Sequence, residues 1–301
     1  MKGGHNMIIV KPKIISPYID GKAIMKNIEK AGRTCYKSEV KDENSYKNFI
    51  KNCINRGHES VIEHEKISVR LITDRGTMWD ITRHRHCSFS IESSRYCNYS
   101  KDKFGNQIKV IEPFFLKPDI QDENSEEWQK YKSWITAMEQ SEKSYFDIIN
   151  NGGTPDQARM VLPASLATEI CMTANIREWR HIFSLRCQST VHPHVRQVMI
   201  PLLLYFKEKM PELFDDIPYD EEFANKYKND LAKIEVEFND IQQFVISQYC
   251  NIMGKDAYDD DVNFEKYENE DIKGKIEILT KLMDLVFVDS IEYTKNGENK
   301  S

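Results

Sequence analysis

The stretch Ile67–His84, ISVRLITDRGTMWDITRH, changes its hydrophobic periodicity part-way along. Apolar and other side chains alternate over its first six residues, which is typical of a half-buried strand. Asp74–Gly76 then turns the chain, and we expect a short helix from Thr77 to about His84. Strands and helices follow one another in the chain without regular βαβ alternation, which predicts an α+β fold.

Similar reasoning outward from this stretch predicts the other elements. Gly57 stands where the C-cap of a helix is expected, and Thr154 and Pro155 form a good helix start. Further strands are expected at Ile8–Ile15, Ile108–Ile111 and Thr168–Thr173. Further helices are expected at Gly21–Gly32, Ser45–Arg56, Asp122–Ile149, Pro155–Pro163, Ile176–Leu185 and Val195–Met210.

The composition changes after about Asp220, where Lys, Glu and Asp dominate. Like-charge runs such as Asp259–Asp261 are usually solvated, so we expect a surface loop there. Helical patterns occur near Leu231–Tyr249 and Gly274–Val288. We therefore expect a catalytic domain over residues 1–220 and a charged, mainly helical C-terminal appendage over residues 221–301.

The bulk properties exclude several classes of protein. The chain has 301 residues, a formal net charge of −6 and 30% charged residues, which is unlike a basic nucleic-acid-binding protein. It has no apolar run near the ~20 residues that cross a bilayer and no apolar signal segment after its first residues. Its seven cysteines are irregularly spaced and suggest reduced thiols. We expect a cytoplasmic protein that binds neither membranes nor nucleic acid.

The segment Arg83–Tyr96, RHRHCSFSIESSRY, contains three arginines, two histidines and four serines in this acidic chain. Arginine binds phosphate bidentately, and serine hydroxyls can complete an anion site. Further arginines recur in apolar segments, where a buried charge needs an anion: Arg159, Arg177, Arg180, Arg186 and Arg196. A solvated basic face is the simpler interpretation. The chain has neither GxGxxG nor a P-loop, so a nucleotide cofactor would have to be held by side chains.

The segment also carries a resemblance. Arg83-His84-Arg85, followed after seven residues by Ser93, is similar to the signature of flavin-dependent thymidylate synthases. Other blocks resemble that family in the same order, and together they span roughly Ile8 to Phe214. They are Ala31–Tyr36, His58–His64, Asp74–Gly76 with Asp80, Arg95-Tyr96, Ala158–Pro163, Asn175–Arg177 and Leu185-Arg186.

The resemblance implies a reaction and a set of ligands. Members of this family methylate dUMP to dTMP, with 5,10-methylenetetrahydrofolate as carbon donor and NADPH-reduced FAD as reductant, and release tetrahydrofolate. The flavin carries the redox chemistry while the protein positions it, so no activated cysteine is needed. The resemblance also implies a mixed sheet flanked by long helices and a homotetramer with active sites at subunit interfaces.

The resemblance further assigns roles to individual residues. Arg186 would contact the uracil and tune its reactivity, and Arg159 would reach dUMP from a neighbouring subunit. Ser93 could be considered a nucleophile, but no Ser-His-Asp arrangement is visible to activate it, so we assign it to binding. The expected dUMP-binding residues are Asp80, Arg83, Ser93, Arg95, Arg159 and Arg186. The expected FAD- and folate-binding residues are His58, Ser60, Glu63, His84, Arg85, His86, Asn175, Arg177 and His181.

Two positions depart from the family pattern, and two other functions remain open. Ile91 stands where relatives usually carry Glu or Gln, a role that Glu92 could fill, and Thr190 stands where a His is common near the flavin. A zinc-dependent hydrolase or deaminase could use the histidines, although His58 and His64 do not have HExxH spacing. A non-catalytic nucleotide- or RNA-binding protein could use the same arginines.

Overall fold

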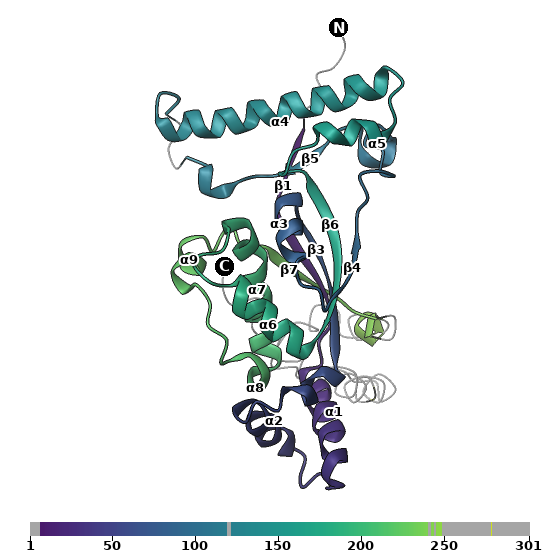
Figure 1. The fold of residues 1–301 in the computed structure, drawn as a ribbon, viewed down its shortest axis with the longest axis vertical. Helices are drawn as coiled ribbons and strands as arrows, with labels where there is room; N and C mark the ends of the chain where they lie inside the picture. The colour runs from purple at the N-terminus through teal and green to yellow at the C-terminus, as the bar shows by residue number, and fades with distance from the viewer. Residues whose placement is uncertain (1–6, 119–121, 240–241, 244, 249–277, 279–301) are drawn as a thin grey trace, which may run out of the picture.

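The computed structural model describes residues 7–118, 122–239, 242–243, 245–248 and 278. The molecule is elongated, with a long helix across one end, two helices at the other, and a sheet between them (Figure 1). Helices α6, α7 and α9 lie together on one side of this sheet in the view of Figure 1. This arrangement confirms the expected α+β fold class.

The main sheet has five strands in the order β4-β6-β3-β2-β7. Its centre is the antiparallel pair β3–β6, which runs in register from Lys66 opposite Asn175 to Asp74 opposite Ala167. The pair β2–β7 is parallel, so the expected mixed sheet is confirmed. The strands are β2 Lys13–Pro17, β3 Lys66–Asp74, β4 Ser88–Ile91, β6 Ala167–Asn175 and β7 Lys233–Glu237.

A second, two-stranded sheet pairs β1 (Ile8–Val10) with β5 (Lys109–Ile111) in parallel. The prediction of one strand over Ile8–Ile15 is therefore wrong, because its two halves belong to different sheets. Pro12 lies between them, and proline has no N–H to donate to a continuous ladder. Strand β4 was not predicted, because its four residues lie within Arg83–Tyr96, which was interpreted only as an anion-binding segment.

Most helices lie where the sequence predicts them, and several have the expected caps. The Asn175 side chain accepts from the Glu178 N–H at the start of α6, and Thr154 forms a capping box with Gln157. The α-helices are α1 Gly21–Arg33, α2 Ser45–Asn55, α3 Arg75–Ile81, α4 Glu126–Asn150, α5 Pro155–Ala158, α6 Ile176–Arg186, α7 Pro193–Lys209, α8 Pro211–Phe214 and α9 Glu221–Lys226. Short 3-10 helices are η1 Thr34–Tyr36, η2 Glu59–His64, η3 Asp102–Phe104, η4 Phe114–Leu116 and η5 Arg159–Val161.

Helix α3 is displaced from its predicted bounds. It begins at Arg75 because the Asp74 carboxylate caps it, accepting from the Thr77 N–H over 2.8 Å. It ends at Ile81, three residues before His84. The residues Arg83–His86 therefore follow the helix rather than belonging to it.

The molecule has two separate hydrophobic cores, a larger one that packs against the main sheet and a smaller one around the sheet of β1 and β5. The larger core includes the fully buried Trp179 and Phe183 of α6 and Phe206 of α7, whose rings contact one another at 5.3–5.5 Å between centroids. The smaller core packs Tyr145 and Phe146 of α4 against strand β5 and its surroundings. Burial of large aromatic rings behind α6 fixes the position of that helix.

The segment after Asp220 differs in part from the expected helical appendage. Phe223 of α9 is buried in the larger core, and β7 adds to the edge of the main sheet next to β2. The helical prediction near Leu231 is wrong over β7, where Ile234 and Val236 alternate with charged residues and pack on the core. The helix expected at Gly274–Val288 lies outside the described residues apart from 278.

Within the part of the chain that the structure describes, no helix combines the length and the apolar character that crossing a membrane requires.

Candidate active site

Arg186, the last residue of α6, is held by two hydrogen bonds to the segment around α3. Its Nε donates to Nε2 of His84 over 2.9 Å, and its Nη2 donates to the backbone carbonyl oxygen of Asp80 over 2.7 Å. These bonds join residues about a hundred positions apart in the chain. The guanidinium therefore has a fixed orientation, and no partner for its Nη1 is found among the described residues.

His84 is buried and has a protein group at each ring nitrogen. Because Nε2 accepts from Arg186, the proton of the neutral ring is on Nδ1, which lies 3.6 Å from a carboxylate oxygen of Glu178. Burial, the positive charge of Arg186 and the neighbouring His181 lower the pKa of His84 to about 4. His84 is therefore neutral at pH 7.

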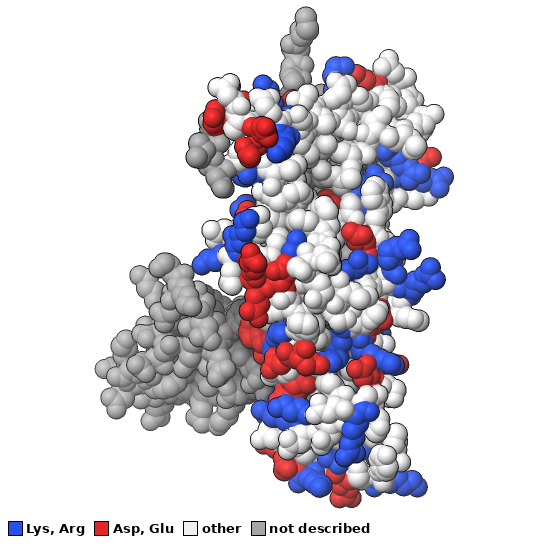
Figure 2. Space-filling view, turned by 60° about the vertical axis from the view of Figure 1, so that its left-hand side comes forward, with Lys and Arg blue, Asp and Glu red and all other residues white. Residues whose placement is uncertain are grey.

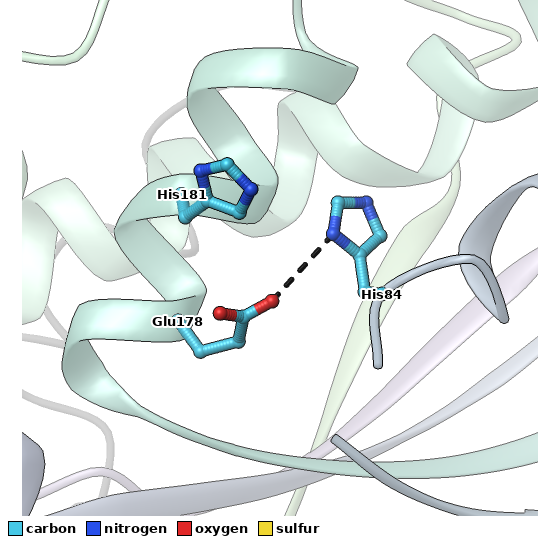
Figure 3. Close-up of side chains that lie close together, drawn as sticks. All are labelled: His84, Glu178 and His181. Carbon is cyan, nitrogen blue, oxygen red and sulfur yellow. Dashed lines mark ion pairs between the residues drawn. The ribbon is translucent and has the colours of Figure 1, made fainter. Parts of the chain in front are cut away.

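His84, Glu178 and His181 form a cluster whose potential ligand atoms lie within 4.8 Å of one another. Glu178 and His181 come from one face of α6, and the Glu178 carboxylate points toward His84 (Figure 3). A metal ion here would need the lone pair of Nδ1, but the Arg186 bond places the lone pair on Nε2. The cluster is therefore a poor metal site.

The four histidines of the zinc alternative are not brought together as ligands among the described residues. The one cluster of potential metal ligands found there contains His84, but not His58, His64 or His86. The geometry thus gives no support to a zinc hydrolase or deaminase.

A cleft of about 780 Å³ lies beside this cluster, within the range of small-molecule sites. It is formed mainly by α6, η2 and the segment after α8. Arg177 lies in it, 2.6 Å from a Glu63 oxygen and 3.3 Å from a Glu59 oxygen, while Arg180 forms a bidentate pair with Asp216 at 2.7 Å. The lining residues are Glu59, Glu63, His86, Asn175, Arg177, Glu178, Arg180, His181, Ser184, Asp216, Ile217 and Pro218.

Five of the nine expected cofactor residues line this cleft: Glu63, His86, Asn175, Arg177 and His181. His58 and Ser60 are exposed at η2 but do not line it, and neither does the exposed Arg85. His84 does not line the cleft: its Nε2 accepts from Arg186, and its Nδ1 lies 3.6 Å from a Glu178 oxygen. A contact of His84 with the flavin therefore stays a prediction.

Arg83 and Arg85 flank the buried His84 and are themselves exposed. Neither has a carboxylate partner among the residues that the structure describes, whereas Arg177 and Arg180 do. Exposed guanidinium groups without acidic partners favour the binding of an anion.

The remaining expected dUMP-binding residues form a second group beyond strand β4. Arg95 and Arg159 approach the same carboxylate oxygen of Asp156, at 3.7 and 3.2 Å. Arg95 is exposed and Arg159 is half-buried, with 58% and 40% of their side chains accessible. Ser93 lies two residues before Arg95 and is partly buried. The structure thus brings Arg95 and Arg159 together, but in a different group from Arg186.

The two departures from the family pattern have structural counterparts. Glu92 accepts a hydrogen bond of 2.9 Å from the buried Tyr99 hydroxyl, so its carboxylate is already engaged in the protein. Thr190 is exposed, and a histidine, His192, follows it two residues later. His192 lies close enough to Asp80 for that carboxylate to raise the pKa of the His192 ring. Burial and His194 nevertheless lower the pKa of His192. Sequence reasoning missed His192, as it did Glu178 and Asp156.

The surface bears on the RNA-binding alternative. Figure 2 shows Lys and Arg interspersed with Asp and Glu on the face in view, without a continuous basic surface. Proteins that bind RNA through its backbone usually present a basic patch or stripe. The face drawn in Figure 2 provides none.

Comparison with known proteins agrees with the site. A family described as thymidylate synthase complementing protein matches residues 21–212. The chain belongs to this family. The resemblance expected from the sequence is thus confirmed, and the matched region contains both groups of arginines and most of the cleft.

Three relatives illustrate the similarity. A probable flavin-dependent thymidylate synthase of Mycobacterium phage L5 is 30% identical over 205 residues, covering 63% of this chain and 79% of that protein. The flavin-dependent thymidylate synthase of Synechocystis is 26% identical, covering 67% of this chain and 93% of that protein. Its counterpart in Geobacter sulfurreducens is 28% identical, with 62% and 78% covered.

Among solved structures, a UMP/dUMP methylase PolB from Streptomyces cacaoi, bound with 5-Br dUMP, has a similar fold. The TM-score is 0.56 at 20% sequence identity, covering 70% of this chain and 96% of that one. At this level of identity the similarity concerns the fold.

Proposed function

We propose that this protein is an enzyme that methylates dUMP to dTMP, with 5,10-methylenetetrahydrofolate as carbon donor and NADPH-reduced FAD as reductant. Family membership supports thymidylate synthesis and dependence on a flavin. The observation that carries the proposal is Arg186, held by His84 and Asp80 next to a cleft of small-molecule size.

Arg186 is suited to act on the uracil ring. Two of its nitrogens are held by the protein, which leaves the Nη1 donors to bind a uracil carbonyl oxygen. A fixed cation at that oxygen stabilises the negative charge of the enolate form of the ring, whose C5 then attacks the carbon donor. The neutral His84 behind Arg186 accepts one hydrogen bond and adds no competing positive charge.

The phosphate of dUMP requires a separate anion site. Arg83 is exposed and without an acidic partner among the described residues, and Ser93 and Arg95 follow β4 nearby in the chain. Charge-assisted hydrogen bonds from two arginines each contribute about 1.5–3 kcal/mol. We assign the phosphate to Arg83, Ser93 and Arg95, with Asp80 contributing near the uracil.

The cleft has suitable groups for FAD. Arg177 and Asn175 stand at the N-terminus of α6, where a phosphate is favoured by the helix dipole, and Glu63 holds Arg177 toward the cleft. His86 and His181 provide hydrogen-bond donors elsewhere in the cleft. When bound, FAD supplies the reducing equivalents that convert the transferred methylene to a methyl group. His58 and Ser60 would lie on the folate side.

A homotetramer would bring Arg159 of one copy to the active site of a neighbouring copy. In this proposal Arg159 reaches the dUMP that is bound to a neighbouring copy. The phosphate of that dUMP then replaces Asp156 as the partner of Arg159. Large exposed apolar side chains near both groups support an interface between copies: Trp79, Tyr96, Met160 and Leu185. We place the enzyme in the cytoplasm.

An anaerobic assay with dUMP, 5,10-methylenetetrahydrofolate, FAD and NADPH tests the reaction. We expect dTMP and tetrahydrofolate as products, and no dTMP when the flavin is removed. Purified protein that contains stoichiometric zinc and no flavin would instead favour a hydrolase. A colourless protein that binds RNA with a steep salt dependence would favour the non-catalytic alternative.

A further inference from the structure

Glu178 is a largely enclosed carboxylate at the wall of the cleft, and neither the sequence nor the reaction above supplies a role for it. It lies in the first turn of α6, and only 11% of its side chain is accessible. A carboxylate so buried is costly unless positive or polar groups face it. The group that faces it is Nδ1 of His84, at 3.6 Å (Figure 3).

The Glu178 charge selects one tautomer of His84. At 3.6 Å the contact is longer than a hydrogen bond, but the negative charge favours a proton on the nitrogen that it faces. With the proton on Nδ1, Nε2 keeps its lone pair and can accept from Arg186. With the proton on Nε2, two N–H groups would face each other and Arg186 would lose this bond.

We propose that Glu178 is a positioning residue, which acts through His84 to orient Arg186 toward the substrate. This role rests on the proposed function for the direction in which Arg186 acts, but the tautomer itself is a property of the protein without ligands. The chain of contacts runs from the first turn of α6 through His84 to the last residue of the same helix.

The other groups around His84 are consistent with a neutral ring. Arg186 contacts it directly, and the ring of His181 lies edge-on at 5.9 Å between centroids. Both groups disfavour a positive charge on His84. Cys87, which also lies near Glu178, is kept as a neutral thiol because burial and the Glu178 charge raise its pKa. Changing the pH between 6 and 8 should therefore leave the tautomer unchanged.

Glu178→Leu and Glu178→Gln separate positioning from packing. The leucine variant loses the acceptor that faces Nδ1, and we expect kcat to fall about 10- to 100-fold while the KM for dUMP changes less than about threefold. Glutamine keeps an oxygen that can face Nδ1–H, and we expect it to restore kcat to within about threefold of the wild-type value. Equal loss in both variants, or no loss in Glu178→Leu, would refute the positioning role.

Two controls isolate the path through His84. Glu127→Leu removes an exposed first-turn carboxylate from α4, so it controls for the loss of a favourable charge at a helix N-terminus. We expect it to retain wild-type kcat. In His84→Gln the amide oxygen can still accept from Arg186, and glutamine has no tautomers for Glu178 to select. Adding Glu178→Leu to this variant should therefore lower kcat by less than a further factor of about two. A full additive loss in this double variant would overturn the proposal.

A measurement without ligands keeps this inference distinct from the reaction. The ¹⁵N spectrum of the histidine rings in flavin-free protein reports which nitrogen of His84 is protonated. We expect Nδ1–H in the wild-type protein and a mixture of tautomers in Glu178→Leu. A wild-type protein that makes no dTMP would refute the proposed function alone, whereas an Nε2–H tautomer would refute the role of Glu178 even if dTMP is formed.

Discussion

The two arginine groups of the candidate site differ in how firmly the protein holds them. Arg186 is bonded to a buried histidine and a backbone carbonyl, behind which lies the aromatic core of Trp179 and Phe183. Arg95 and Arg159 share one exposed carboxylate at 3.7 and 3.2 Å. A site that stabilises developing charge needs fixed donors, while a group that meets a ligand or a second copy can rearrange.

The two groups therefore differ in the free energy needed to break their contacts. Buried and connected contacts are expensive to break, because the partner that remains is left without a bond. Exposed ion pairs contribute between about 0 and 1 kcal/mol, so they can be exchanged for a substrate phosphate at little cost. The predictions below therefore have larger effects near Arg186 than near Asp156.

The largest effect is expected from Arg186→Ala. Removal of a fixed donor that stabilises developing charge lowers kcat by about 10²- to 10³-fold. Steady-state dTMP formation at saturating dUMP measures this change, with Arg70→Ala as control because Arg70 forms ion pairs on the sheet surface with Glu169 and Glu237. Activity of Arg186→Ala within threefold of wild type would remove Arg186 from the reaction.

Arg83→Ala should weaken dUMP binding without changing the fold. Loss of a charge-assisted phosphate contact worth about 1.5–3 kcal/mol raises the dissociation constant about 10- to 100-fold. Titration with dUMP gives the constant, and circular dichroism checks that the fold is intact. Wild-type affinity or turnover in this variant would place the phosphate elsewhere.

Acid should destabilise the protein through His84. Its pKa is lowered from 6.5 to about 4, so between these values the unfolded chain binds a proton that the folded protein does not. The free energy of unfolding is therefore undiminished above pH 6.5 and falls by on the order of 1 kcal/mol per pH unit as the pH decreases toward 4. Urea unfolding of wild type and His84→Gln measures this, and parallel pH profiles would contradict the buried neutral ring.

The smallest effect is expected from Asp156→Ala. This substitution releases Arg95 and Arg159 from an exposed carboxylate, so the free energy of unfolding should change by less than about 1 kcal/mol. The KM for dUMP should stay the same or fall by up to about threefold, since two arginines become free for phosphate. A large rise in KM would mean that Asp156 holds these arginines in their active positions.

Local patterns in the sequence predict most of the fold. Asn175 before an apolar run and the Thr154-Pro155 pair correctly place the starts of α6 and α5, because a cap depends only on neighbouring residues. The division of Ile8–Ile15 into two strands was missed because the sequence of one segment does not show which other strands it pairs with. Strand β7 was missed because its pairing with β2 overrides a polar, helix-like composition.

The candidate site is predictable only in part. Resemblance identifies Arg83, Arg186 and the cleft residues Asn175 and Arg177, but the sequence does not reveal which of them touch. The bond from Arg186 to His84 joins residues 102 positions apart, and Glu178 becomes informative only when its carboxylate faces that ring. Tertiary contacts of this kind have no signal in local spacing.

Titration of the purified protein with dUMP, followed by its visible spectrum, tests most directly whether flavin and substrate share one site beside Arg186. We predict a yellow protein whose flavin bands shift in a saturable way as dUMP is added, and a shift that is lost or greatly reduced in Arg186→Ala. A colourless protein, or flavin bands that dUMP leaves unchanged, would contradict this account.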